Sequence, residues 1–246
     1  MRISIAPKKE YICIPGKKLR LNIQIEYPPS SWKYIKVSIR FHETLGIAKI
    51  ERTITEKSEA NFCVIQQDII LPDVLGRYKL GSIEIESNGD IDYEDLPHVN
   101  ILTHDAYFEE QVAETMRKLG FHAKRYGGPK NPDVVATHPF FPEQKFHVEA
   151  TTQAEYDISK FRSDKAKFDE LKLEFKFKHL LIVSLASPSD ITRDVYDRLK
   201  KTSDPVSLIC YEDLENMARE YTGFRVSSYE IFATLNQSGF ICLEKR

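Results

Sequence analysis

The chain has 246 residues, of which 41% are hydrophobic, 29% charged and 11% aromatic, and its formal net charge is -2. This length allows one large domain or two ordinary ones, and the nearly balanced charge excludes a surface that coats nucleic acid non-specifically. No stretch resembles a signal peptide or reaches the length of a membrane span, so we expect a cytoplasmic protein with no membrane partner. The four cysteines, Cys13, Cys63, Cys210 and Cys242, form no CxxC pair, which disfavours zinc fingers and redox motifs and indicates buried free thiols.

The first 87 residues show the period-two alternation of half-buried β-strands. The clearest strand is Lys18–Tyr27, and the pattern returns over 35–41 and, with one slip at Gly81, over 78–85. Turn residues separate these strands from weaker ones expected at 2–5, 11–14, 48–54 and 62–71. So many short strands predict an all-β antiparallel sandwich over residues 1–87. It contains no convincing catalytic cluster, and we expect a recognition or assembly domain that binds DNA, a partner protein or a second copy of itself.

Residues 88–103 are acidic and rich in turn residues, a composition typical of a linker. From residue 104 to 246 the pattern changes to alternating helices and strands, which predicts an α/β domain. Its first helix places Phe108, Val112, Met116 and Leu119 on one face and ends at Gly120. Strands are expected at 133–136, 146–150, 179–185 and 206–210, with a final short strand after Gly239; helices are expected at 154–177, 190–201, 211–220 and 227–235.

Two acids stand at the ends of neighbouring predicted strands, Asp133 in Asn131-Pro-Asp-Val-Val-Ala136 and Glu149 in Lys145-Phe-His-Val-Glu-Ala150. Mg²⁺ prefers oxygen ligands and usually takes one or two carboxylates together with waters and phosphate oxygens. Such an ion offsets charge on a phosphate and activates a bound water. We therefore expect Asp133 and Glu149 to hold Mg²⁺, or Mn²⁺ in its place, with Glu109 of the preceding helix as a third acid and Glu110 as the weaker choice.

Two neighbouring features receive simpler interpretations. His147 alternates to the strand face opposite Val148, and we expect it to be structural rather than a metal ligand. The turn Gly127-Gly128-Pro129 is too short to cradle a phosphate.

The order of these residues resembles the PD-(D/E)xK restriction-endonuclease-like nucleases. The segment 107–121 is similar to the first helix of the Mrr-like branch, with Glu109 at its acidic position. Pro132-Asp133 and Glu149 stand at the positions of the two motif acids. The resemblance covers about residues 104–221. It implies a restriction-endonuclease-like α/β domain with a central mixed sheet, metal-dependent cleavage of double-stranded DNA, and a homodimer.

The sequence departs from this family at one position. The usual lysine follows the second acid by two residues, where this chain has Thr151. The polar residues Gln153, Lys160 and Lys165 are the candidates to replace it, and we favour Lys165.

Seven basic residues fall between positions 160 and 178, which indicates either a DNA-contacting helix or a solvated helix face: Lys160, Arg162, Lys165, Lys167, Lys172, Lys176 and Lys178. We expect the first four of them to contact the DNA backbone.

The leading hypothesis is a Mg²⁺-dependent DNA endonuclease, of which a restriction-type enzyme is one candidate, with Asp133, Glu149, Glu109, Thr151 and Lys165 as its site residues. The alternative, motivated by Thr151, is a catalytically inactive nuclease fold that binds DNA or protein. A third interpretation is an adaptor whose sandwich binds while the α/β half is a spacer.

Overall fold

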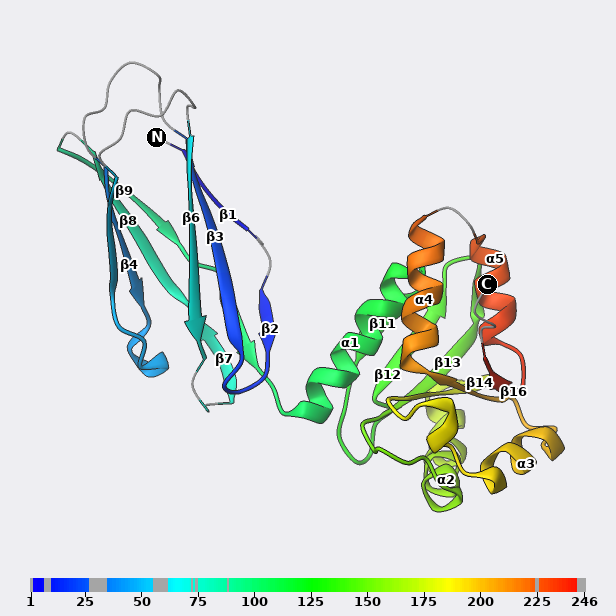
Figure 1. The fold of residues 1–246 in the computed structure, drawn as a ribbon. Coiled ribbons are helices and arrows are strands. Elements are labelled where there is room, and N and C mark those ends of the chain that lie inside the picture. The colour runs from blue at the N-terminus through cyan, green and yellow to red at the C-terminus, as the bar shows by residue number, and fades with distance from the viewer. Residues whose placement is uncertain are drawn as a thin grey trace. The chain divides into compact units, whose positions relative to one another are not determined.

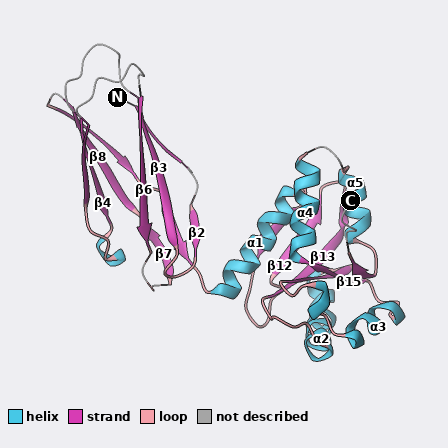
Figure 2. Cartoon of the chain, in the orientation of Figure 1, coloured by secondary structure: helices cyan, strands magenta, loops and turns pink. Residues whose placement is uncertain are grey.

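The computed structural model describes residues 2–6, 10–26, 35–54, 62–71, 73, 75–87, 89–223 and 226–242. Contacts within the chain divide it into two compact units, Met1–Thr103 and His104–Arg246. The first unit is built of strands and the second alternates helices with strands (Figure 1, Figure 2). Across the described ranges, no helix has the length and apolarity needed to cross a membrane.

The strands of the first unit follow the predicted alternation. On the strand at Lys18–Glu26, Leu19, Leu21, Ile23 and Ile25 are buried, because every second side chain points to the same face. The strands pair in three sheets, of order β1-β3-β6, β2-β10-β7 and β5-β4-β8-β9. Their bounds are β1 Arg2–Ala6, β2 Tyr11–Cys13, β3 Lys18–Glu26, β4 Ile35–Phe41, β5 Ile50–Ile54, β6 Phe62–Ile70, β7 Gly76–Lys79, β8 Gly81–Ser87, β9 Asp90–Asp95 and β10 His98–Ile101, with a 3-10 turn at Glu43–Leu45.

These sheets share one apolar core. Ile23 of β3, Ile39 of β4 and Ile85 of β8 are fully buried in it, together with Val99 of β10. Burying a side chain of this size contributes about 1.5–3 kcal/mol. The pairing is antiparallel except between β10 and β2, which run parallel.

The prediction of a linker over residues 88–103 is wrong for most of that segment, which forms two strands. Asp90–Asp95 forms β9, which pairs with β8 at the edge of its sheet, and His98–Ile101 forms β10. The acidic residues of β9 suit an edge strand, because charged side chains there stay exposed and discourage further pairing. Leu96, just after β9, is buried in the core, but β9 itself buries almost none of its side chains, so its composition resembles that of a linker.

The slip in the alternation at Gly81 marks the passage from β7 to β8, which belong to different sheets. Gly81 has φ +146°, a backbone conformation that L side chains rarely adopt. A Cβ added there would lie 2.0 Å from the carbonyl oxygen of Arg40 in β4. A glycine is therefore required by both the backbone and its neighbour.

Replacing Gly81 with alanine is expected to destabilise the first unit by more than the ~1–3 kcal/mol of backbone strain alone. Hydrogen exchange of the peptides covering β4 and β8 would measure it as faster exchange. Gly89→Ala is the matched control, since Gly89 also has a positive φ, +90°, but nothing lies within 4 Å of the added Cβ. Equal exchange in the two variants would contradict the expected clash.

The second unit is a mixed α/β fold. Its sheet has the order β11-β12-β13-β14-β15-β16, antiparallel from β11 to β13 and parallel from β13 to β16. The bounds are α1 His104–Lys118, β11 His122–Arg125, β12 Val134–His138, β13 Phe141–Thr151, α2 Ile158–Phe175, β14 His179–Ser184, α3 Arg193–Lys201, β15 Val206–Cys210, α4 Tyr211–Thr222, α5 Ser228–Leu235 and β16 Gly239–Ile241, with a 3-10 turn at Pro188–Asp190.

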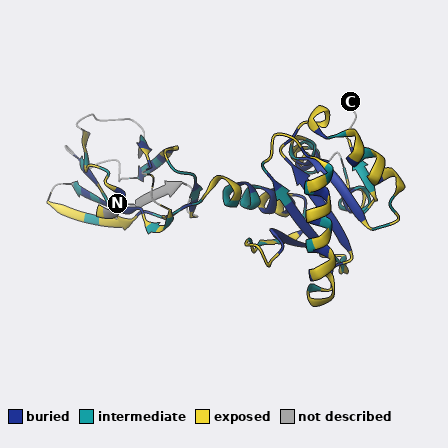
Figure 3. Ribbon diagram, turned by 90° about the horizontal axis from the view of Figure 1, so that it is seen from below, coloured by how far each residue is buried: buried dark blue, intermediate teal, exposed yellow. Residues whose placement is uncertain are grey.

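Helices cover both faces of this sheet: α1, α4 and α5 lie on one side and α2 and α3 on the other (Figure 1). On β13, Phe146 and Val148 pack toward α1, whereas the alternating residues His147 and Glu149 meet side chains of α2. The strands are mostly buried and the helices expose their outer faces (Figure 3). Burial on both faces explains the continuous apolar run of β14.

One strand of the second unit was not predicted, and several element boundaries of this unit differ from the predicted ones. β11 was not predicted, because His122-Ala-Lys-Arg125 shows no apolar alternation. In the described sheet this strand pairs only with β12 and lies at the edge. The predicted helix 154–177 is shorter, spanning Ile158–Phe175. Asp157 caps its start by accepting a hydrogen bond from the Lys160 amide at 2.8 Å, and side-chain caps of this kind fix where helices begin.

Lowering the pH from about 7.5 to about 5 is expected to cost the second unit about 2 kcal/mol through His179 alone. His179 is buried, its Nε2 bonds to Ser207 Oγ at 2.8 Å, and burial lowers its pKa to about 4. The unfolded chain therefore binds this proton first, and stability is lost as the pH falls from about 6.5 toward 4.

Urea unfolding followed by the helical circular dichroism signal would measure this loss, because the described α-helices all lie in the second unit. The control is His179→Gln, which keeps a donor toward Ser207 but does not titrate. The wild-type chain should lose more stability than this variant between the two pH values. Parallel losses would contradict the assignment to His179.

Candidate active site

Asp133 lies immediately before β12 and is buried. Its Oδ2 accepts a hydrogen bond from the backbone N–H of Ala150 at 2.9 Å, which ties the acid to the neighbouring strand. The antiparallel register pairs Val134 with Val148, so the next position along the ladder sets Asp133 beside Glu149. Strand pairing therefore brings together the two acids predicted from the sequence.

Glu149 is 2% exposed and faces α2. Burial, followed by repulsion from Asp133, raises the pKa of Glu149 to about 8, against the attraction of Lys167. Two carboxylates held this close in a buried setting favour a positively charged group or a metal ion beside them.

Lys167 of α2 supplies such a charge. Its Nζ lies 2.8 Å from Glu149 Oε2 and 3.2 Å from Asp133 Oδ1, and its side chain is 20% exposed. Burial lowers the pKa of Lys167, but attraction to the two carboxylates outweighs it and the pKa is raised. From the sequence we predict that Lys167 contacts DNA, and the structure places it in this cluster.

Glu109 of α1 belongs to the same electrostatic cluster. Burial, then repulsion from Asp133, raises its pKa to about 7. Its Oε2 lies 3.4 Å from Arg125 Nη1 and packs so close to Gly127 that an added Cβ there would lie 2.9 Å from it. The glycine turn therefore leaves room for an acid of α1. The neighbouring Glu110 pairs with Arg117 at 2.6 Å and with Arg125 at 3.7 Å.

His147 meets the acids from the same face of β13. Its Nε2 forms a hydrogen bond with Glu149 Oε1, and the ring is fully buried. Burial, and then the charge of Lys167, lowers the pKa of His147 to about 4. The ring is therefore neutral, and in its Nε2–H tautomer it donates to the Glu149 carboxylate.

The structure does not bring Lys165 to the acids. Its Nζ pairs with Asp169 at 2.6 Å and with Asp204 at 3.4 Å, because residue 165 projects about 200° around the helix from residue 167. The prediction that Lys165 replaces the motif lysine beside the two acids is therefore wrong.

Three other predicted polar residues have local partners. Lys160 pairs with the buried Asp164 at 2.5 Å, which also accepts a hydrogen bond from the Tyr156 hydroxyl at 2.8 Å. Thr151 is buried, and its Oγ1 accepts from the backbone N–H of Gln153 at 3.4 Å. The Gln153 residue itself is exposed.

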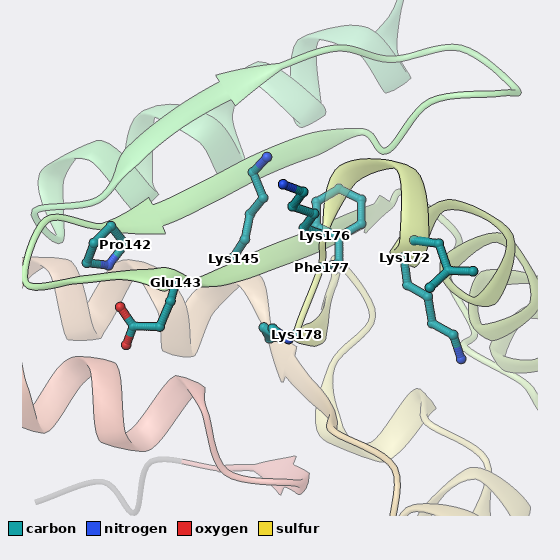
Figure 4. A pocket seen from close by; sticks show the side chains of 8 residues that line it. Pro142, Glu143, Lys145, Lys172, Lys176, Phe177 and Lys178 are labelled. Carbon is teal, nitrogen blue, oxygen red and sulfur yellow. The ribbon is translucent and has the colours of Figure 1, made fainter.

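The distal part of the predicted basic surface borders a shallow hollow at the C-terminal end of α2 (Figure 4). Two of its lysines have local partners, since Lys145 Nζ donates to the carbonyl of Phe175 at 3.1 Å and Lys172 pairs with Asp169 at 2.9 Å. Lysines commonly bind the last carbonyls of a helix in this way. The hollow is lined by Pro142, Glu143, Lys145, Lys172, Leu173, Lys176, Phe177 and Lys178.

Asp133 and Glu149 offer the donor set that Mg²⁺ accepts. Among the described residues, no group of three His, Cys, Asp or Glu side chains is arranged to hold a metal ion. Mg²⁺ commonly uses only one or two protein carboxylates and fills its remaining positions with water and substrate oxygens. The two acids therefore fit Mg²⁺, with Glu109 coupled to them through charge.

Comparisons with known proteins give matches among solved structures alone. No protein-family model and no curated protein matches this sequence. Two solved structures of the restriction endonuclease FokI, one of them bound to DNA, match at 14% and 15% identity, each with a TM-score of 0.46. Each match covers 56% of this chain and 28% of the FokI chain, so the matched part spans a little over a quarter of that protein.

Proposed function

We propose that the chain is a metal-dependent DNA endonuclease of the PD-(D/E)xK type, whose motif lysine is supplied by α2. The observation that carries this proposal is the position of Lys167 Nζ, within 3.2 Å of both Asp133 and Glu149. Thr151 is buried and carries no charge, so it does not replace the lysine. Lys167 brings an ammonium group to the same acids from another element.

Each side chain has a part in hydrolysing a phosphodiester bond. Asp133 and Glu149 would hold Mg²⁺, which when bound offsets charge on the phosphate and makes a bound water more acidic. Lys167 donates hydrogen bonds from its ammonium and stabilises the negative charge that develops on the phosphate oxygens. Glu109 adds negative charge beside Asp133 and strengthens the attraction for a cation.

The substrate proposed is double-stranded DNA, approached along α2. Arg162 is exposed on this helix and would contact a backbone phosphate, as Arg and Lys side chains commonly do. Cutting both strands requires two active sites, so we propose a homodimer. The first unit would provide recognition or dimer contacts.

Incubation of supercoiled plasmid with the full chain tests this function. Nicked and linear products are expected with Mg²⁺ or Mn²⁺, and none when EDTA is added. A labelled RNA duplex, run in parallel, reports the preference for DNA. Salt-sensitive DNA binding without cleavage in either metal would contradict the endonuclease and favour a catalytically inactive binding module.

A further inference from the structure

His147 occupies a position in the sheet that folding alone would give to an apolar residue. It is fully buried, and its ring contacts the rings of Phe177 and Phe168, with centroid distances of 4.9 and 5.7 Å. Its Nδ1 is buried and has no hydrogen-bond partner among the described residues. Such an unpaired polar atom costs about 1–3 kcal/mol, so packing does not explain a histidine here.

The other ring nitrogen makes a contact that an apolar residue would lack. Nε2 bonds to Glu149 Oε1, while Lys167 Nζ lies 2.8 Å from Glu149 Oε2. Each oxygen of this carboxylate therefore has its own partner. Together the two partners restrain rotation of the Glu149 carboxylate about the Cγ–Cδ bond.

A second buried histidine of the same sheet shows the contrast. His179 of β14 is 2% exposed, and its Nε2 bonds to Ser207 Oγ, which in turn donates to the carbonyl of Leu235 at 3.1 Å. These contacts join β14 to β15 and to the end of α5, away from the acids. The contacts of His179 stabilise the packing of the sheet, whereas the Nε2 contact of His147 is made to the Glu149 carboxylate.

We infer that His147 is a positioning residue that fixes the Glu149 carboxylate so that Oε2 faces Asp133 and Lys167. This inference rests on the proposed function, because it assigns His147 to the site in which Glu149 would hold a metal ion. A partner that orients a ligating group commonly changes metal affinity by about 10–100-fold. Holding the ring in this orientation leaves Nδ1 without a hydrogen-bond partner among the described residues, which lowers the stability of the fold.

Calorimetric titration of the full chain with Mn²⁺ tests the inference. His147→Phe removes the donor and keeps a ring, and we expect its Mn²⁺ affinity to fall by about 10–100-fold. His147→Gln places an amide donor near the position of Nε2, so its affinity should stay within a few-fold of wild type. His179→Phe is the matched control at the opposite face of the sheet and should bind as wild type does.

A measurement on the unmodified protein covers the case in which His147→Phe does not fold. In ¹⁵N-labelled wild-type chain, Mg²⁺ should shift the Nε2 resonance of His147 and leave that of His179 unchanged. Wild-type chain that binds no metal would overturn the proposed function itself. Wild-type chain that binds metal, with an unmoved His147 resonance or with His147→Phe binding equally well, would overturn the positioning role alone.

Discussion

Replacing Lys167 with methionine is expected to slow plasmid cleavage by about 10²–10³-fold, the usual loss when one donor to the developing charge is removed. Methionine keeps most of the length of the side chain but removes the ammonium that lies between Glu149 and Asp133. The rate of single-turnover cleavage at saturating Mg²⁺ is the measurement, so that weaker metal binding does not contribute.

Lys165→Met is the matched control for this prediction. Lys165 lies on the same helix, and its partners are Asp169 and Asp204, so its loss should leave the rate nearly unchanged. Full activity of Lys167→Met together with an inactive Lys165→Met would restore Lys165 as the catalytic lysine.

Asp133→Asn and Glu149→Gln are each expected to reduce cleavage to the level of a sample without protein. Each variant removes one of two adjacent carboxylates that would hold the metal ion, so Mn²⁺ affinity should fall by more than the about 10–100-fold of an orienting partner. The double variant should be no worse than either single one, because residues that act as a unit are not additive. Plasmid cleavage and calorimetry measure the two effects.

Glu110→Gln is the control for the acids. Glu110 neighbours Glu109 on α1, but its partners are Arg117 at 2.6 Å and Arg125 at 3.7 Å and not the two acids, so neither metal affinity nor cleavage should change. Metal binding that survives unchanged in both Asp133→Asn and Glu149→Gln would show that these acids are not the ligands.

Much of the fold could be predicted because its signals are local. Alternation placed β3, and the stripe of Phe108, Val112, Met116 and Leu119 placed α1, since all four side chains are buried. β9 and β11 carried no such signal, because edge strands bury little. Strand pairing in the second unit brought Asp133 and Glu149 together, as expected of acids at neighbouring strand ends.

Lys167 could not be assigned to the acids from sequence spacing. Its side chain reaches them because α2 packs on the sheet with the buried stripe of Phe161, Asp164, Phe168 and Leu171 inward, and Lys167 lies one turn after Asp164. The position of Lys167 close to this buried stripe was the available signal, but the run of basic residues led us to predict that Lys167 contacts the DNA backbone. The role of His147 depends on which oxygen of Glu149 it meets, and that contact exists only in three dimensions.

Anomalous scattering from crystals of the full chain soaked in Mn²⁺ tests the central claim most directly. We expect one strong peak within coordination distance, about 2.0–2.3 Å, of oxygens from both Asp133 and Glu149. Lys167 Nζ should lie beside that ion and no longer between the two acids. A Mn²⁺ peak bound by other residues, with the Lys167 ion pairs intact, would contradict it.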